Sequence, residues 1–253
     1  MKTLPSSYDI IGDIVIVDLR DKKLSEKKVA EAIIAKNRQV KVVAKKVGKH
    51  SGKYRTQKLK IIFGEKRKET VHKENGVIIK LNVETCYFSQ RSSTERARIA
   101  KLIKSGEQVL EMFSGVGPFP LVIAKHSKAK EITAIEINPQ AHKYAEDNVR
   151  INKINNIKLL KGDVKKVLPK LKKKFDRIVM PLPKTAEEFL PLAKKYAKKG
   201  ATIHYYTFGK EDEFEEIKTK LKKLFFKTKS MDIVKCGQYS PYVYRMCVDI
   251  KLP

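Results

Sequence analysis

Three acidic residues each follow a short apolar run in the second half of the sequence. Glu111 closes "VLE", Glu136 closes "ITAIE" and Asp163 follows "IKLLKG". If these runs are neighbouring parallel strands, the three side chains meet at one edge of the sheet. Carboxylates gathered there repel one another unless a ligand supplies an ammonium group, ribose hydroxyls or an aromatic amine. The alternative is that Glu111 caps a helix and the other two are solvated turn residues.

A glycine-containing turn separates the first of these runs from a helix. Gly115 and Gly117 in "FSGVGPF" allow a tight turn and a close approach of a ligand to backbone N–H groups. The pyrophosphate-binding form requires a third glycine where this chain has Pro120, and Glu111 would repel a pyrophosphate. The carboxylates can instead accept from the ammonium, ribose and adenine groups of S-adenosylmethionine. The predicted cofactor site includes Glu111, Met112, Phe113, Gly115, Gly117, Glu136, Ile137, Asp163 and Val164.

Two prolines end a further apolar run. Residues 178–180 are Ile-Val-Met, and Pro181-Leu182-Pro183 follow. Proline has a fixed φ and no backbone N–H, so this segment forms a rigid turn that is poor in hydrogen-bond donors. Such a turn suits a pocket wall.

The order of predicted elements indicates two domains. Residues 1–89 contain mostly short β-like runs and are interpreted as a small α+β substrate and RNA-binding domain. Residues 90–253 alternate strands with helices, which indicates an α/β fold with a parallel sheet. Five β/α units followed by a β-hairpin, as predicted here, are typical of the seven-stranded, Rossmann-like sheet of class I methyltransferases.

Composition and charge indicate the class of partner. The chain has 253 residues, of which 42% are hydrophobic and 33% charged, with a formal net charge of +28. A surface this basic attracts polyanions, which indicates nucleic acid, although a lysine-rich genome would produce similar numbers. No run approaches a membrane span and the N-terminus has no signal peptide, so we expect a cytoplasmic protein. The three cysteines form no recognisable metal or disulfide pattern, and no metal is expected.

Five motifs in order resemble a known family. "YFSQRSSTERARIA", "VLEMFSGVGPF", "AIEINP", "MPLPKTAEEFL" and "IHYYTFGKEDEF" are similar to the archaeal and eukaryotic tRNA (guanine-37-N1)-methyltransferases and their relatives in wyosine biosynthesis. The resemblance runs from about Tyr8 to the C-terminus and does not include the family's additional N-terminal domain. It implies methyl transfer from S-adenosylmethionine to the purine at position 37, in the anticodon loop of tRNA(Phe), by a monomer.

The family resemblance gives the two prolines a role in substrate choice. The guanine-37 enzymes have Asn-Leu-Pro where this chain has Pro181-Leu182-Pro183, so the amide of the first position is missing. Pro183 keeps the rigid corner, whereas Pro181 changes the hydrogen bonds that the pocket can make. This substitution resembles the branch that methylates C7 of 4-demethylwyosine, alone or in addition to N1 of guanosine.

The resemblance also assigns catalytic roles to charged residues. Glu95 of "STER" is the expected base that removes the N1 proton of guanine. Arg96 would position the base or a phosphate, and Arg55 of "KYRTQK" would stabilise charge on the purine O6. Without the resemblance, Glu95 is an ordinary residue of a helix start and Arg55 is one exposed cation among many.

Three residues before this helix complete the expected site. Tyr87 and Phe88 could stack on a flipped base or on the adenine of the cofactor, or belong to the core as strand aromatics often do. Arg91 of "SQR" is expected beside the cofactor and in contact with the phosphate backbone.

Two other functions fit parts of the same sequence. One is transfer of the 3-amino-3-carboxypropyl group of the same cofactor to C7 of 4-demethylwyosine, which the absence of the N-terminal domain favours. The other is a non-catalytic RNA-binding module, which retention of Glu111, Glu136 and Asp163 disfavours.

The charge generates the first testable expectation. If Lys and Arg neutralise several phosphates, the tRNA-binding constant should fall as the salt concentration rises. In a plot of the logarithm of the binding constant against the logarithm of the salt concentration, each phosphate contact contributes about −0.7 to −0.9 to the slope. A filter-binding titration between low and moderate salt measures this slope. A flat titration would mean that the lysines reflect genome composition instead.

Overall fold

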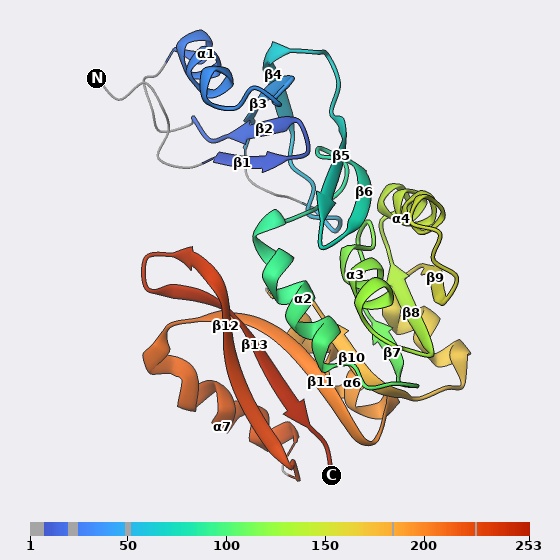
Figure 1. The fold of residues 1–253 in the computed structure, drawn as a ribbon. Coiled ribbons are helices and arrows are strands. Elements are labelled where there is room, and N and C mark those ends of the chain that lie inside the picture. Colours follow the sequence, from blue (N-terminus) through green and yellow to red (C-terminus); the bar gives the residue numbers. More distant parts are fainter. Residues whose placement is uncertain (1–7, 20–24, 49–51, 184, 226) are drawn as a thin grey trace.

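The computed structural model describes residues 8–19, 25–48, 52–183, 185–225 and 227–253. Parts of the expected first domain, at 1–7, 20–24 and 49–51, lie outside the described residues. The described chain forms two larger sheets with a separate two-stranded hairpin between them (Figure 1). None of the described helices is long and apolar enough to cross a membrane.

The first sheet has four strands in the order β1-β2-β3-β4. They are β1 (Tyr8–Ile11), β2 (Ile14–Val17), β3 (Val42–Lys46) and β4 (Leu59–Gly64). Helix α1 (Glu26–Lys36) connects β2 to β3, which are parallel, while the other pairs are antiparallel. Val29 and Ile33 of α1 pack against Val15, Val17 and Val43, so one face of the sheet is covered.

A two-stranded hairpin follows, and its first strand was not predicted. Strands β5 (Glu69–Glu74) and β6 (Val77–Asn82) are antiparallel and are joined at Asn75 and Gly76. Both turn residues have positive φ, 44° and 68°, as the tightest hairpin turns require. The Asn-Gly pair was the available signal, and the polar run "ETVHKE" concealed the strand before it. The expected domain boundary at residue 89 falls after this hairpin.

The second sheet has seven strands in the order β12-β13-β11-β10-β7-β8-β9. They are β7 (Gln108–Glu111), β8 (Glu131–Glu136), β9 (Ile157–Lys161), β10 (Phe175–Met180), β11 (Ala197–Gly209), β12 (Ser230–Ser240) and β13 (Val243–Lys251). Strands β7 to β11 are parallel, and β13 is antiparallel to both of its neighbours. The predicted α/β class with parallel strands and a final hairpin is confirmed.

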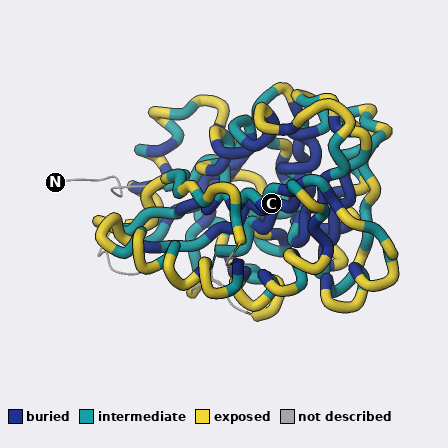
Figure 2. The backbone as a smooth tube through the Cα atoms, turned by 90° about the horizontal axis from the view of Figure 1, so that it is seen from below, coloured by how far each residue is buried: buried dark blue, intermediate teal, exposed yellow. Residues whose placement is uncertain are grey.

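Helices cover both faces of the seven-stranded sheet. They are α2 (Ser93–Leu102), α3 (Pro118–His126), α4 (Pro139–Ile151), α5 (Val164–Val167), α6 (Leu190–Tyr196) and α7 (Phe214–Leu224), with short 3-10 turns η1 (Gln90–Ser92), η2 (Leu168–Leu171), η3 (Ala186–Phe189) and η4 (Glu211–Glu213). Ile99 of α2 and Leu121 of α3 belong to one core cluster, and Leu190 of α6 and Leu221 of α7 belong to another. Figure 2 shows the buried strands inside the exposed outer helices and loops.

Two asparagines of α4 hold the hairpin to the second sheet. The side chain of Asn148 is fully buried, accepts from the Lys80 backbone N–H at 2.7 Å and donates to the Lys80 and Val116 carbonyls at 3.0 Å. The side chain of Asn152 likewise accepts from the Ile78 backbone N–H at 2.8 Å and donates to the Ile78 carbonyl at 2.6 Å. These contacts fix the segment that leads from β6 into the cavity described below.

We expect Asn148→Ala to lower the free energy of unfolding by at least about 3 kcal/mol, because it leaves three backbone groups without partners at about 1–3 kcal/mol each. Lys143→Ala, at an exposed position of the same helix, is the matched control and should change it by less than about 0.5 kcal/mol. Urea denaturation measures both variants. Equal effects of the two would show that the hairpin is held by other contacts.

Candidate active site

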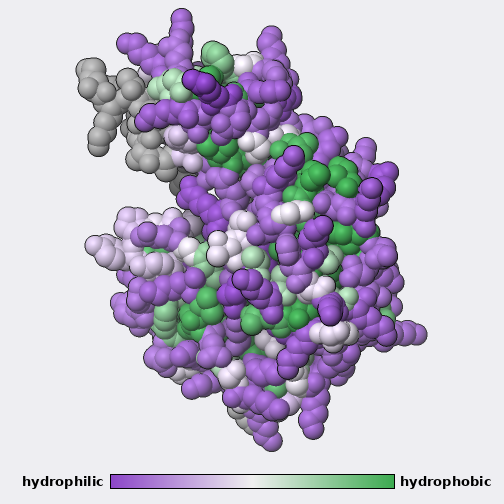
Figure 3. Space-filling model, in the orientation of Figure 1, coloured by the Kyte–Doolittle hydropathy of each residue, from purple (hydrophilic) through white to green (hydrophobic). Residues whose placement is uncertain are grey.

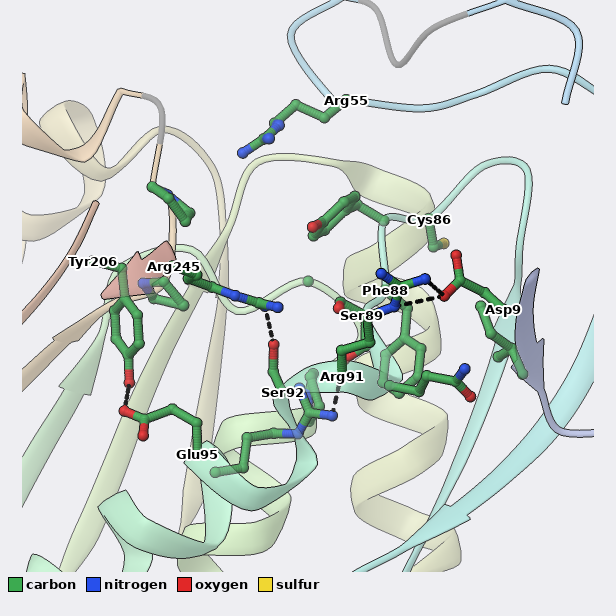
Figure 4. Close-up of a pocket in the computed structure, with 18 of the residues that line it drawn as sticks. Asp9, Arg55, Cys86, Phe88, Ser89, Arg91, Ser92, Glu95, Tyr206 and Arg245 are labelled. Atoms are coloured by element: carbon green, nitrogen blue, oxygen red, sulfur yellow. Dashed lines mark hydrogen bonds and ion pairs between the residues drawn. The ribbon is translucent and has the colours of Figure 1, made fainter. Parts of the chain in front are cut away.

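A cavity of about 640 Å³ lies where the first sheet meets the carboxyl ends of β7 and β10. Segments distant in the sequence form its wall, among them β1, residues 83–96, the turn after β7, the two prolines after β10 and the β12–β13 hairpin. Figure 4 shows Arg55 extending over it, opposite Glu95 and Tyr206. Among the predicted residues, the cavity is lined by Arg55, Tyr87, Phe88, Arg91, Glu95, Arg96, Glu111, Phe113, Gly115, Pro181 and Pro183.

The other predicted residues lie outside the lining of this cavity. They are Met112, Gly117, Glu136, Ile137, Asp163 and Val164. Met112 is fully buried in a core cluster, and its contact with the cofactor stays a prediction. Val164 is buried in the same cluster. Asp163 accepts from the Lys165 backbone N–H at 2.9 Å and so caps the short helix α5.

Glu136 shapes the glycine turn directly. One of its carboxylate oxygens accepts from the Gly115 backbone N–H at 2.6 Å, and the other accepts from the Asn138 N–H at 2.7 Å. Burial raises the pKa of Glu136, although these backbone donors oppose the shift. Gly115 and Gly117 have φ of 55° and 86°, values that favour glycine. The Glu136 carboxylate, at the end of β8, therefore fixes the conformation of the glycine turn that follows β7.

Glu111 is the buried polar group that this turn surrounds. It is 1% exposed, and its Oε2 has no hydrogen-bond partner among the described residues. Burial raises the pKa of Glu111 well above its ordinary value of 4.5, and the charge of Glu136 adds to the shift. An unpaired buried acceptor is costly, so the site suits a ligand with a cationic donor. The ammonium group of S-adenosylmethionine is such a donor, so the residues present fit this cofactor.

Glu95 lies in the first turn of α2 and is held by two donors. Arg98 donates to both of its carboxylate oxygens, at 2.7 and 2.8 Å, and the Tyr206 hydroxyl donates to Oε1 at 2.6 Å. The side chain of Glu95 is buried but lines the cavity. Burial raises the pKa of Tyr206, and the charge of Glu95 adds to this, so the phenol remains a donor. Oε2 has fewer partners than Oε1 and is the oxygen with the freer acceptor position.

Arg98 also belongs to a series of hydrogen-bonded side chains, most of them charged. Asp249 accepts from Arg98 at 2.6 Å and contacts His204 Nδ1 at 2.6 Å, while Arg177 lies 2.8 Å from His204 Nε2. Because a guanidinium group only donates, Nε2 accepts and the neutral imidazole carries its proton on Nδ1. Burial lowers the pKa of His204, which agrees with this neutral form. Burial alone would raise the pKa of Asp249, but the bonds from His204 and Arg98 outweigh it and lower the pKa.

The same region contains a group of potential metal ligands. Atoms of His204, Cys247 and Asp249 lie within 4.8 Å of one another. The thiol of Cys247 donates to Asp249 at 3.1 Å, so the ligand atoms already bond one another. The guanidinium groups of Arg98 and Arg177 border them, which disfavours a further cation.

Arg96 lines the cavity but is bound mainly within the protein. The residue is 2% exposed, and its guanidinium binds both carboxylate oxygens of Glu74 in β5, at 2.5 and 2.6 Å. It also donates to the Ser89 carbonyl and lies over the ring of Phe88. These contacts hold the wall of the cavity, and the contact of Arg96 with a base or a phosphate stays a prediction.

The predicted aromatic and basic residues face the cavity from the opposite side. Arg91 pairs with Asp9 of β1 at 2.8 Å, which joins the first sheet to the start of α2 (Figure 4). Arg55 lies 5.2 Å above the ring of Tyr87 and has a positive φ of 52°. Tyr87 is 42% exposed, whereas Phe88 is half-buried and packs against the core.

The two prolines form the corner that the sequence predicted. The Leu182 carbonyl accepts from the N–H groups of Thr185 and Ala186, so it belongs to the following turn. Leu182 packs its side chain in the core, while Pro181 and Pro183 line the cavity. This part of the wall is therefore apolar and rigid.

Comparison with known families identifies this arrangement. Residues 70–234 match the sequence model of the TRM5/TYW2 methyltransferase domain, and residues 1–67 match that of the TYW2 N-terminal domain. The chain belongs to the TRM5/TYW2 methyltransferase family. The predicted family, the predicted fold class and the prediction of an S-adenosylmethionine-dependent methyltransferase are confirmed.

Relatives in the TRM5/TYW2 family differ in the reaction their names describe. The chain is 40% identical to tRNA (guanine(37)-N(1))-methyltransferase Trm5b of Pyrococcus abyssi, with 98% of this chain and 76% of the relative covered. It is 36% identical to tRNA (guanine(37)-N(1))/4-demethylwyosine(37)-methyltransferase Taw22 of Nanoarchaeum equitans, with 83% and 86% covered. It is 34% identical to tRNA(Phe) (4-demethylwyosine(37)-C(7)) aminocarboxypropyltransferase of Methanocaldococcus jannaschii, with 96% and 97% covered.

Solved structures of the TRM5/TYW2 family share the fold. The crystal structure of Trm5b from Pyrococcus abyssi matches with a TM-score of 0.86 at 40% identity, covering 98% of this chain and 75% of the other. A complex of aTrm5 with tRNALeu matches with a TM-score of 0.86 at 34% identity, covering 98% of this chain and 72% of the other. Methanocaldococcus jannaschii TYW2 in complex with AdoMet matches with a TM-score of 0.73 at 28% identity, covering 97% of this chain and 98% of the other.

The sequence did not lead us to several residues that line the cavity or hold those that do. Arg98 stands three residues after Glu95, a spacing at which side chains meet on a helix, so this signal was present. Tyr206, Asp9 and Arg245 reach the cavity from strands far away in the sequence, and nothing local marks them. Ser114, in the glycine turn, lines the cavity with a buried hydroxyl that has no partner among the described residues.

The raised pKa of Glu111 leads to a pH-dependent prediction. A carboxyl whose pKa is higher in the folded state stabilises that state in acid and loses this contribution as the pH rises above about 4.5. Without cofactor, Glu111→Gln should therefore be more stable than the wild type near neutral pH, with the difference shrinking towards pH 4. Urea denaturation across this range measures it.

The same variant should lose cofactor affinity. Losing a charge-assisted bond worth about 1.5–3 kcal/mol should weaken binding of S-adenosylmethionine at least about tenfold. Glu216→Gln, at an exposed position of α7, is the matched control for both measurements. If Glu111→Gln binds the cofactor as the wild type does, the fit of the ammonium group to Glu111 is wrong.

Proposed function

We propose that this protein transfers a methyl group from S-adenosylmethionine to the purine at position 37 of tRNA, in the anticodon loop of tRNA(Phe). The observation that carries the proposal is the unpartnered Oε2 of Glu111 in the same cavity as Glu95 and the apolar proline corner. One cavity thus offers a site for a cationic cofactor, a carboxylate base and a flat wall for a ring. The proposal includes a monomeric, cytoplasmic enzyme.

The cofactor would be held along the carboxyl edge of β7, β8 and β9. Glu111 would accept from its ammonium group, Glu136 from its ribose and Asp163 from its adenine. When bound, S-adenosylmethionine supplies an electrophilic methyl group on a positively charged sulfur. The glycine turn would let the ligand approach the backbone closely, because no side chain stands at Gly115 or Gly117.

The purine would be held between the two sheets of the chain. Tyr87 and Phe88 would contact its ring, and Arg55 would stabilise negative charge on its O6. Glu95 would accept the N1 proton of guanosine at Oε2, the oxygen with fewer partners. Arg98 and Tyr206 would keep that carboxylate in one orientation, since both donate to it from fixed elements.

The proline corner bears on which atom of the purine is methylated. Pro181 offers no side-chain amide to the edge of guanine, so substrate recognition at this wall depends on stacking and shape. This favours C7 of 4-demethylwyosine, a tricycle that has already lost the N1 proton, with N1 of guanosine as an additional target. The named activity of Taw22 combines both reactions in one relative.

A second candidate is transfer of the aminocarboxypropyl group. It is supported by the match of residues 1–67 to the TYW2 N-terminal domain. The aminocarboxypropyltransferase of Methanocaldococcus jannaschii is covered over 97% of its length, against 76% for Trm5b. Both reactions use the same cofactor and the same tRNA position, so the product distinguishes them.

The experiment supplies the protein with S-adenosylmethionine and tRNA(Phe) that carries guanosine or 4-demethylwyosine at position 37. Mass spectrometry of the digested nucleosides separates a methyl group from the much heavier aminocarboxypropyl group. Methylation of either nucleoside supports the proposal, and methylated 4-demethylwyosine supports the C7 branch. Aminocarboxypropyl transfer would establish the second candidate, and loss of activity in Glu95→Ala with guanosine would support its role as base.

Pro181→Asn tests the role of the corner. Restoring an amide should raise N1-methylation of guanosine relative to C7-methylation of 4-demethylwyosine. One neutral hydrogen bond is worth roughly 0.5–1.5 kcal/mol, so the ratio should change by a few-fold to about tenfold. Single-turnover rates on both tRNAs measure it. An unchanged ratio would mean that Pro181 only ends the strand.

A further inference from the structure

The β12–β13 hairpin contains two irregularities in one strand. The register against β13 shifts between Lys235 and Gly237, and again between Gln238 and Ser240. Cys236 and Tyr239 are therefore the extra residues of two successive β-bulges. A bulge bends its strand and redirects a side chain, and bulges are frequent beside functional sites. The second bulge directs Tyr239 towards the cavity, which it lines.

Tyr239 packs against another aromatic ring, and more than half of the residue is exposed. Its ring lies 4.3 Å from the ring of Phe208, with an angle of 38° between the two planes. Phe208 is half-buried at the end of β11 and lines the same cavity, whereas Tyr239 is 57% exposed. The pair forms an aromatic surface at the mouth of the cavity.

The hairpin that carries this surface is fixed to the cavity wall. Arg245 of β13 donates to the hydroxyl of Ser92 in η1, as Figure 4 shows. The backbone of β12 also packs against η1. The aromatic surface is therefore positioned before any ligand binds. Figure 3 shows the hairpin tip in pale colours beside a notch that separates it from the first sheet.

The charge around this surface favours a nucleic acid over an apolar partner. Arg245 lines the same cavity, as does Arg91, which is paired with Asp9, and Lys235 of the same hairpin is paired with Glu211. The chain as a whole has a net charge of +28. Aromatic side chains beside cationic ones are the arrangement by which proteins stack single-stranded bases and hold the phosphates that connect them.

The depth of the two positions separates a base on Tyr239 from the reacting base. Glu95, beside which the target purine would react, is 5% exposed, whereas Tyr239 is 57% exposed at the mouth of the same cavity. A base stacked on the exposed face of Tyr239 therefore belongs to a different nucleotide from the one that reacts near Glu95.

We propose that Tyr239, backed by Phe208, is a stacking site for the nucleobase that adjoins the target nucleotide in the tRNA loop. The inference rests on the proposed function, because it takes tRNA as the substrate. A base stacked at the mouth holds the loop open, so that the target purine can enter the cavity while its neighbour stays outside.

Binding of RNA to Tyr239→Ala, Tyr239→Phe and the wild type tests the site. The probes are tRNA(Phe) with an intact loop and the same tRNA with an abasic nucleotide at position 36 or at position 38. Tyr239→Ala should weaken binding of intact tRNA by roughly 5- to 100-fold, and Tyr239→Phe by less than about twofold. Phe63→Ala, at an exposed aromatic position of β4 outside the cavity, is the matched control and should leave binding unchanged.

The abasic probes separate stacking from a structural effect. If Tyr239 stacks on a neighbouring base, the difference between wild type and Tyr239→Ala disappears on one of the two abasic tRNAs. The slope of affinity against salt should be the same for both proteins, because no phosphate contact is removed.

Two results would overturn the inference. One is unchanged affinity of Tyr239→Ala for intact tRNA, and the other is an equal loss on all three probes. The binding measurements require no turnover, so wild-type product analysis tests the proposed function separately. A protein that shows the abasic effect without group transfer would keep the stacking site and lose the proposed function.

Discussion

A series of hydrogen-bonded charged and polar side chains holds helix α2 in place. The geometry of the cavity depends on the position of this helix. Arg177 binds Glu107 at 2.7 Å and contacts His204, and the series continues through Asp249 and Arg98 to Glu95. Charges taken out of water must be paired, since an unpaired buried ion costs several kcal/mol. The series therefore holds α2 in one position against β10, β11 and β13. Because α2 begins at the cavity, its position sets the distance between the two sheets.

The two sheets contribute different parts of the site. The seven-stranded sheet supplies the carboxylates at its carboxyl edge and the proline corner. The first sheet supplies Asp9 and the segment that carries Arg55, which close the cavity from above. The ion pair of Arg91 with Asp9 crosses from one part to the other. A cavity assembled in this way depends on both sheets being present.

Local sequence patterns determined much of the second sheet but little of the contact network. Alternating apolar runs predicted β7 to β11, and the glycine and proline residues predicted the turn and the corner, because periodicity and backbone restrictions are properties of short segments. The spacing in "ERAR" indicated that Arg98 would face Glu95, but the sequence did not show which residue Arg96 would be paired with. That pairing depends on packing between residues far apart, as does the bond from Arg98 to Asp249.

The asparagines of α4 have a consequence for the behaviour of the chain in concentrated solution. A two-stranded hairpin normally leaves an open edge, whose free N–H and C=O groups can pair with a strand of another molecule and start aggregation. Here Asn148 and Asn152 occupy the N–H and C=O groups of Ile78 and Lys80 along the edge of β6. On the other strand the bonds are of a different kind, because the side chains of Thr70 and His72 accept from the backbone of Asp13 and Gly12 in the β1–β2 turn. Side-chain amides thus do for the edge of β6 what a third strand would do, and they occupy groups that a strand of another molecule would need.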